Sequence, residues 1–168
     1  LLVMVASAAV YYNITMQPSV TITPAGVTFK EGDDWNLSWS MGTNNTWCAL
    51  ALKAYPNTTL TYEEPLNLTN TGDSVGVTLK AISISPASGN AQVSNFTFIN
   101  FTLHSDTGLV MGYLNYTTGG TNTWSIDSID PVNMGTGDEW YITIQTKAAA
   151  GAQASIVANI VIAVDVQE

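Results

Sequence analysis

The chain has 168 residues, which is enough for one ordinary domain with a sizeable core. Hydrophobic residues make up 46% of it, charged residues only 10%, and Arg is absent. Four Lys oppose thirteen Asp and Glu, so the net charge is −9, which argues against nucleic acid and anionic membrane surfaces as partners.

The first predicted element is the N-terminal segment, the most hydrophobic stretch of the chain. Its even-numbered positions are all apolar, whereas Ser7, Asn13 and Thr15 occupy odd positions, and this period of two predicts an extended strand over residues 1–16. An apolar strand at a chain end promotes aggregation unless another segment covers it. Its own domain or a neighbouring subunit must therefore cover the even face, which comprises Leu2, Met4, Ala6, Ala8, Val10, Tyr12, Ile14 and Met16.

A hydrophobic helix is the alternative structure for this segment. The core helix of a type IV pilin needs about 20 uninterrupted apolar residues. Here the polar residues Asn13, Thr15 and Gln17 interrupt the apolar run. The strand therefore fits the pattern better than the helix.

Further rows of alternating apolar residues follow along the chain, and helical periodicity is hard to find. The residues that we expect to point inward are, in chain order, Trp35, Leu37, Trp39 and Met41; Cys48, Leu50, Leu52 and Ala54; Val75, Val77 and Leu79; Phe96 and Phe98; Phe101 and Leu103; Trp140, Ile142 and Ile144; and Ile156, Ala158, Ile160, Ile162, Val164 and Val166. Clusters of Gly, Pro, Asn and Asp separate these rows. Between Phe98 and Phe101 the inward positions change from even to odd, which predicts a β-bulge or a bend.

This pattern predicts an all-β fold. Short strands with mostly antiparallel connections favour an immunoglobulin-like or pilin-like β-sandwich of about eight or nine strands. The N-terminal strand over residues 1–16 stands before the sandwich domain, which we place at residues 17–168.

The tripeptide Asn-x-Ser/Thr, the acceptor signal for N-glycosylation, occurs eight times. The acceptor residues are Asn13, Asn36, Asn44, Asn57, Asn67, Asn95, Asn100 and Asn115. In six of these sequons the middle residue is apolar, so we expect the Asn and its hydroxyl partner to share the outer face of a strand while the middle residue points inward. Asn44 and Asn57 lie in turn-like segments, which are equally accessible. Glycans at these sites indicate an extracellular location.

Residues for catalysis and metal binding are scarce. The chain has a single His, His104, which we interpret as a loop residue, and a single Cys, Cys48, which we interpret as a buried small hydrophobe. This scarcity excludes metal sites built from imidazole and thiolate. It also excludes Ser–His and Cys–His nucleophile pairs unless His104 serves alone. The acidic segments 31–35 and 136–140 each precede a Trp and read as turns rather than as calcium sites. We therefore predict that the protein is not an enzyme and holds no metal or cofactor besides covalent glycans.

An exported, Thr- and Asn-rich β-sandwich with many sequons, without paired cysteines and led by an apolar strand, resembles the archaeal thread pilins. These are glycosylated filament subunits that are joined head to tail by donor strands, and their architecture is similar to that of bacterial chaperone–usher pilins. The resemblance covers the whole chain. It implies that the even face from Leu2 to Met16 fills the groove of the next subunit and that the eight sequon Asn residues carry glycans.

The function that this resemblance implies is a structural subunit of an extracellular, cell-surface filament with a role in adhesion or cell contact. Its partners would be copies of itself in a helical homopolymer, together with cell or surface ligands, and it would not span a membrane once assembled. Two alternatives stay open. One is a type IV pilin with an N-terminal core helix, and the other is a monomeric surface glycoprotein or glycan-binding module that folds residues 1–16 into its own sandwich.

Overall fold

The structure is a computed structural model. It describes residues 13–16, 26–42, 45, 48–86, 96–118, 124–128, 130–150, 152 and 157–167. Within these ranges the regular structure is extended, with no α-helix, so the all-β prediction is confirmed.

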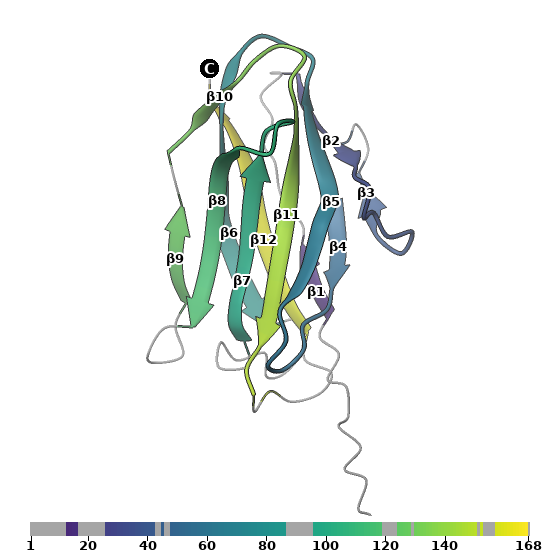
Figure 1. Cartoon of the computed structure of the whole chain (residues 1–168), viewed down its shortest axis with the longest axis vertical. Helices are drawn as coiled ribbons and strands as arrows, with labels where there is room; N and C mark the ends of the chain where they lie inside the picture. The colour runs from purple at the N-terminus through teal and green to yellow at the C-terminus, as the bar shows by residue number, and fades with distance from the viewer. Residues whose placement is uncertain are drawn as a thin grey trace, which may run out of the picture.

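In the described part of the chain, twelve strands form two six-stranded sheets, which lie face to face in Figure 1. The β12 sheet has the order β10 (Val132–Met134), β6 (Val75–Pro86), β12 (Val157–Gln167), β1 (Asn13–Met16), β4 (Cys48–Leu52) and β3 (Ser40–Met41). The β11 sheet has the order β2 (Val27–Glu31), β5 (Leu60–Asn70), β11 (Glu139–Ala148), β7 (Phe96–His104), β8 (Val110–Thr118) and β9 (Trp124–Ser128). The described strands outnumber the predicted eight or nine, partly because short strands such as β3 and β10 carry too little periodicity to be recognised.

One hydrophobic core lies between the two sheets, and it receives side chains from both. Four of the predicted rows are confirmed as fully inward: Cys48, Leu50, Leu52 and Ala54; Val75, Val77 and Leu79; Phe101 and Leu103; and Trp140, Ile142 and Ile144. Alternation shows most clearly in β11, where every second side chain is buried from Trp140 to Ala148. The hydrophobic burial of these rows supplies the main driving force for the fold.

The prediction that Leu37 points inward is wrong, since its side chain is 97% exposed. The Asn36 Oδ1 accepts hydrogen bonds from the backbone N–H of Ser38 at 2.9 Å and from its hydroxyl at 2.8 Å. The backbone N–H of Trp39 also donates to the Asn36 carbonyl at 2.8 Å. This Asx-type turn interrupts the alternation, because a turn rather than a strand precedes Ser40. Trp39 is buried nonetheless and meets Trp35 edge to face, with ring centroids 5.6 Å apart.

The predicted change of inward parity in β7 is real, but it lies nearer the N terminus than expected. Lys147 pairs with Phe98 and Ala148 pairs with Phe96, so Thr97 is an extra residue in β7 and forms a bulge. Inward positions therefore change between Phe96 and Ile99, and Phe98 is only half-buried on the outer face. The assignment of Phe98 to the core is thus wrong.

Candidate assembly edge and glycosylation sites

The last four residues of the predicted N-terminal strand lie in the chain's own β12 sheet. β1 pairs in parallel with β12, from Asn13 opposite Val157 to Met16 opposite Ile160. On its other side β1 pairs antiparallel with β4, from Ile14 opposite Leu52 to Met16 opposite Leu50. β1 is therefore an interior strand of this sheet, and Figure 1 shows it between β12 and β4.

The pairing of β12 is uneven on its two sides. Towards β6 it is paired over almost its whole length, from Ala158 to Gln167. Towards β1 the pairing ends at Ile160, and among the residues that the structure describes no strand continues it along residues 161–167. An unpaired strand edge presents N–H and C=O groups that can pair with another chain. Residues 17–25, which follow β1 in the chain, lie outside the described residues. We call residues 161–167 of β12, on the side of β1, the assembly edge, after the role that is proposed for it below.

The predicted donor positions divide into two groups. Ile14 and Met16 lie in β1, where their backbone pairs within the same chain. The remaining six lie outside the described residues: Leu2, Met4, Ala6, Ala8, Val10 and Tyr12. Their contact with a neighbouring subunit stays a prediction, as does the boundary between residues 16 and 17.

Two of the predicted glycosylation sites are exposed turn residues. Asn36 lies at the turn before β3. Its Oδ1 accepts both hydrogen bonds from Ser38, so its Nδ2 takes no part in that contact. Asn57 lies in the tight turn between Tyr55 and Thr58 and has a positive φ of 60°, a conformation that Asn tolerates better than most residues. Both turns are accessible, although Leu37 in the first one points outward rather than inward.

Two other sites, Asn100 and Asn115, lie on the outer face of the β11 sheet as expected. The inward residues beside them, Phe101 and Tyr116, are buried, and their rings meet edge to face with centroids 6.2 Å apart. Asn100 and Asn115 themselves are half-buried, and the Oδ1 of Asn100 is buried. The backbone of Asn13 belongs to β1, whereas Asn44 and Asn95 lie outside the described part of the chain.

Asn67 does not have the accessibility that we expected. It faces outward between Leu66 and Leu68, but only 8% of it is exposed. Its Nδ2 donates to Glu64 Oε1 at 2.9 Å, and its strand neighbours in register are Lys30 and Tyr141. The side chain of Asn67 is thus largely buried in the folded chain, and its glycosylation stays a prediction.

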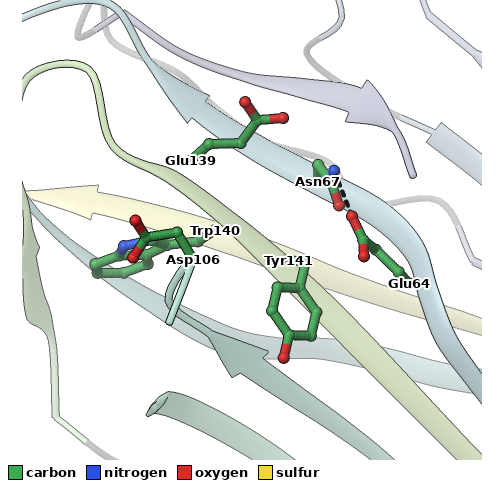
Figure 2. A pocket seen from close by; sticks show the side chains of 6 residues that line it. All are labelled: Glu64, Asn67, Asp106, Glu139, Trp140 and Tyr141. Carbon is green, nitrogen blue, oxygen red and sulfur yellow. Dashed lines mark hydrogen bonds between the residues drawn. The ribbon is translucent and has the colours of Figure 1, made fainter. Parts of the chain in front are cut away.

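Asn67, Glu64 and Tyr141 also line a recess of about 270 Å³ on the outer face of the β11 sheet, which sequence reasoning missed. Figure 2 shows Glu64 and Asn67 on β5, Trp140, Tyr141 and Glu139 on β11, and Asp106 from the turn after β7. Most of the polar atoms that line the recess are oxygens that accept hydrogen bonds, so the recess favours hydrogen-bond donors and cations as ligands. Within the described residues no group of three His, Cys, Asp or Glu side chains is arranged to hold a metal ion.

Internal contacts already use two of the recess carboxylates. Glu139 Oε1 forms an ion pair with Lys30 Nζ at 2.8 Å, and this hydrogen bond and charge raise the pKa of Lys30. Glu64 accepts from Asn67. His104 is the last residue of β7 rather than a loop residue, and its ring stacks on Tyr141 with centroids 4.8 Å apart. The recess therefore serves the packing of this face, and we assign it no chemical step.

The acidic segments form turns, as predicted. Asp34 Oδ2 accepts the backbone N–H groups of Glu63 at 2.7 Å and Glu64 at 3.3 Å, where β5 bulges opposite β11. Asp138 Oδ2 accepts the N–H of Gly135 at 2.7 Å. Both carboxylates thus satisfy backbone donors at irregular positions, which explains their presence without a bound ion.

Cys48 is fully buried in the core, and this burial raises the pKa of its thiol to about 12. A thiol of this kind stays protonated and is a poor nucleophile. The interpretation of Cys48 as a small hydrophobe is therefore confirmed.

None of the described residues belongs to a helix that is long and apolar enough to cross a membrane. Comparison with protein-family models and with curated proteins found no match.

Proposed function

We propose that this chain is a structural subunit of an extracellular filament, in which each subunit lends its N-terminal strand to the β12 sheet of a neighbour. The resemblance to the archaeal thread pilins motivates the proposal. The observation that carries it is the assembly edge, where seven residues of a central strand have a described partner strand on one side only. Strand addition at such an edge joins two chains through backbone hydrogen bonds.

The proposal assigns different tasks to the two parts of the N-terminal segment. Residues 13–16 hold the segment in its own sheet as β1, and residues 1–12 are the part that is lent to the neighbour. The lent part keeps six of the eight even-face residues, namely Leu2, Met4, Ala6, Ala8, Val10 and Tyr12. Burying these six side chains at about 0.5–2 kcal/mol each contributes roughly 3–12 kcal/mol before the entropy of association is subtracted.

The composition supports a glycosylated exterior for this subunit. Only 10% of the residues are charged, so ions alone give the surface little solubility. The exposed turns at Asn36 and Asn57 and the outer face with Asn100 and Asn115 are the described positions where glycans would supply it. We propose an immunoglobulin-like, pilin-like sandwich coated with glycans, extracellular, and active in adhesion or cell contact rather than in catalysis.

A monomeric surface or glycan-binding domain is the second candidate function. The observation that favours it is the pairing of β1 within its own chain, which a self-contained domain also requires. In that account the chain's own residues 17–25, which lie outside the described ranges, would continue the pairing along the assembly edge. A type IV pilin is less favoured, because residues 13–16 are extended rather than helical.

Electron microscopy of the purified native protein and of a Val10→Asp variant separates these accounts. The filament proposal predicts fibres for the native protein and soluble single subunits for Val10→Asp, since a carboxylate on the inserted face would be buried without a partner. The variant Thr15→Ser, a conservative change on the odd face, serves as the control and should form fibres. Monomers in all three samples would support the self-contained domain instead.

A further inference from the structure

Two five-residue segments on neighbouring strands share one pattern, in which an aromatic, an aliphatic, an Asn, an aromatic and a Thr follow each other. They are residues 98–102 on β7, with the sequence Phe-Ile-Asn-Phe-Thr, and residues 113–117 on β8, with the sequence Tyr-Leu-Asn-Tyr-Thr. The second and fourth residues of each segment are buried in the core. The first, third and fifth residues therefore share the outer face of the β11 sheet.

The antiparallel register places these two segments around a common centre. Asn100 lies directly opposite Asn115, Phe98 opposite Thr117 and Thr102 opposite Tyr113. The outer face thus carries a local two-fold arrangement, in which each Asn has its own aromatic ring on one side and its own Thr on the other. Directly opposite residues have Cβ atoms only about 4.5–5.5 Å apart. Two modifications at the centre would collide unless they leave it in opposite directions.

The aromatic residue two positions before the Asn recurs at other sequons. Tyr55 precedes Asn57 and Tyr11 precedes Asn13 in the same way, so four of the eight sequons have this residue. Aromatic residues make up 10% of the chain, and fewer than one such coincidence in eight is expected by chance. Phe98 also places an apolar ring, only half-buried, on the sheet face that carries Asn100, Thr102 and Asn115.

We propose that the first sugar of an N-linked glycan at Asn100 packs on the ring of Phe98, and that the first sugar of a glycan at Asn115 packs on the ring of Tyr113. This inference rests on the glycosylated surface of the proposed function. In a strand the ring at i−2 lies on the same face as the Asn at i, about 6–7 Å along the chain. The C–H face of a sugar ring carries partial positive charge, and it packs favourably on the negative face of an aromatic ring.

The two-fold arrangement also sets the directions in which the two glycans leave the Asn100–Asn115 pair. Because β7 and β8 are antiparallel, Phe98 and Tyr113 lie on opposite sides of the Asn100–Asn115 centre. Sugars that pack on these rings diverge from each other, so both sites carry glycans in the same molecule despite their closeness. The sugars also cover the apolar surface of Phe98 that the bulge at Thr97 turns outward.

Intact-mass measurement and glycopeptide mapping of the native protein test the occupancy. We expect Asn100 and Asn115 to be modified together on single molecules. If Asn36 or Asn57 is modified while Asn100 and Asn115 are bare or never modified together, the inference fails and the glycosylated filament survives. If no sequon is modified, both the inference and the glycosylated exterior fail.

Thermal unfolding of matched variants tests the packing. Phe98→Leu keeps apolar bulk but removes the ring, and it is compared in two backgrounds, the native sequon and Asn100→Gln. We expect Phe98→Leu to lower Tm by about 2–4 °C more in the glycosylated background, which corresponds to roughly 1 kcal/mol for a chain of this size. Tyr113→Leu with and without Asn115→Gln should behave alike. Equal decreases in both backgrounds would overturn the inference.

A readout that does not depend on stability completes the test. In proton NMR spectra of the native glycoprotein, ring currents should shift the resonances of the first sugar at Asn100 upfield. The shift should disappear in Phe98→Leu and persist in Tyr113→Leu. Sugar resonances that are the same in all three proteins would show that the sugars do not pack on these rings.

Discussion

The side-chain nitrogen of Asn70 donates a hydrogen bond of 3.1 Å to the backbone carbonyl of Met134, across 64 positions of sequence. The same Nδ2 also lies 2.8 Å from the Asp73 carbonyl and 3.2 Å from that of Gly135, and the backbone carbonyl of Asn70 accepts from the N–H of Gly137. Asn70 is fully buried. It therefore joins the turn after β5 to the turn between β10 and β11 at one end of the sheets.

Replacing Asn70 by Ala should lower the free energy of unfolding by about 2–4 kcal/mol, because several buried carbonyls lose their donor at once. Chemical denaturation followed by tryptophan fluorescence measures the loss. Asn133→Ala is the matched control, since Asn133 is an exposed Asn of nearby β10, and its effect should stay under about 0.5 kcal/mol. Similar losses for both variants would show that Asn70 does not join the turns.

Leu37 and Leu50 make a second pair of matched positions. Leu50 is fully buried in β4, and Leu50→Ala should lower the free energy of unfolding by about 2–5 kcal/mol. Leu37→Ala should change it by less than about 0.5 kcal/mol in the isolated subunit, since this side chain is almost completely exposed. A large loss of stability in Leu37→Ala would contradict the turn at Asn36–Ser38.

Alkaline pH should destabilise the fold through two buried acids. Burial raises the pKa of Tyr116 to about 12 and that of Cys48 to about 12, above their ordinary values of 10.0 and 9.0. Each group thus contributes stability that is fully present below its unfolded pKa and is lost as pH rises towards the folded pKa. We expect the free energy of unfolding to be unaffected by these groups below about pH 8 and to fall between about pH 9 and pH 12.

Cys48→Ala and Tyr116→Phe should each reduce that alkaline slope, since each removes one titrating group. Their effect on the slope is separate from any loss of packing, which shifts stability at all pH values alike. Denaturation at a series of pH values from 7 to about 11 measures it. An unchanged slope in the double variant would mean that other groups govern the alkaline transition.

The sequence predicted the fold where one strand face is buried and the other is polar. β4 and β11 show this alternation, so their inward residues from Cys48 to Leu52 and from Trp140 to Ile144 are those predicted. The alternation fails where a local hydrogen bond determines the backbone conformation. Leu37 is an example, because its exposure follows from the turn that begins at Asn36. The alternation also fails where both faces of a strand carry aromatic residues, as at Phe98. The bulge at Thr97 changes which side chains point inward, and no residue in the sequence marks the position of that bulge.

The candidate sites were predictable to a smaller extent, because they depend on contacts between distant segments. Asn67 faces outward as its sequon suggested, but its burial and its hydrogen bond to Glu64 depend on the bulge and the strand register of β5. The pairing of β1 with β12 joins residues at opposite ends of the chain and in parallel, which periodicity does not reveal. The assembly edge follows from this pairing and could not have been found from sequence alone.

Two truncated chains test the central claim, that residues 1–12 complete a neighbour while residues 13–16 complete the chain's own sheet. A chain that begins at Asn13 keeps β1, so it should fold as a soluble monomer with an open assembly edge. A chain that begins at Gln17 loses β1 from the centre of its sheet and should be markedly less stable.

The most direct measurement is the binding of a synthetic peptide of residues 1–12 to the chain that begins at Asn13, followed by calorimetry and by the Tm of the complex. The account predicts saturable one-to-one binding that raises Tm, and a peptide with Val10→Asp that does not bind. Absence of binding by the native peptide, together with filaments formed by the chain that begins at Asn13, would contradict the account.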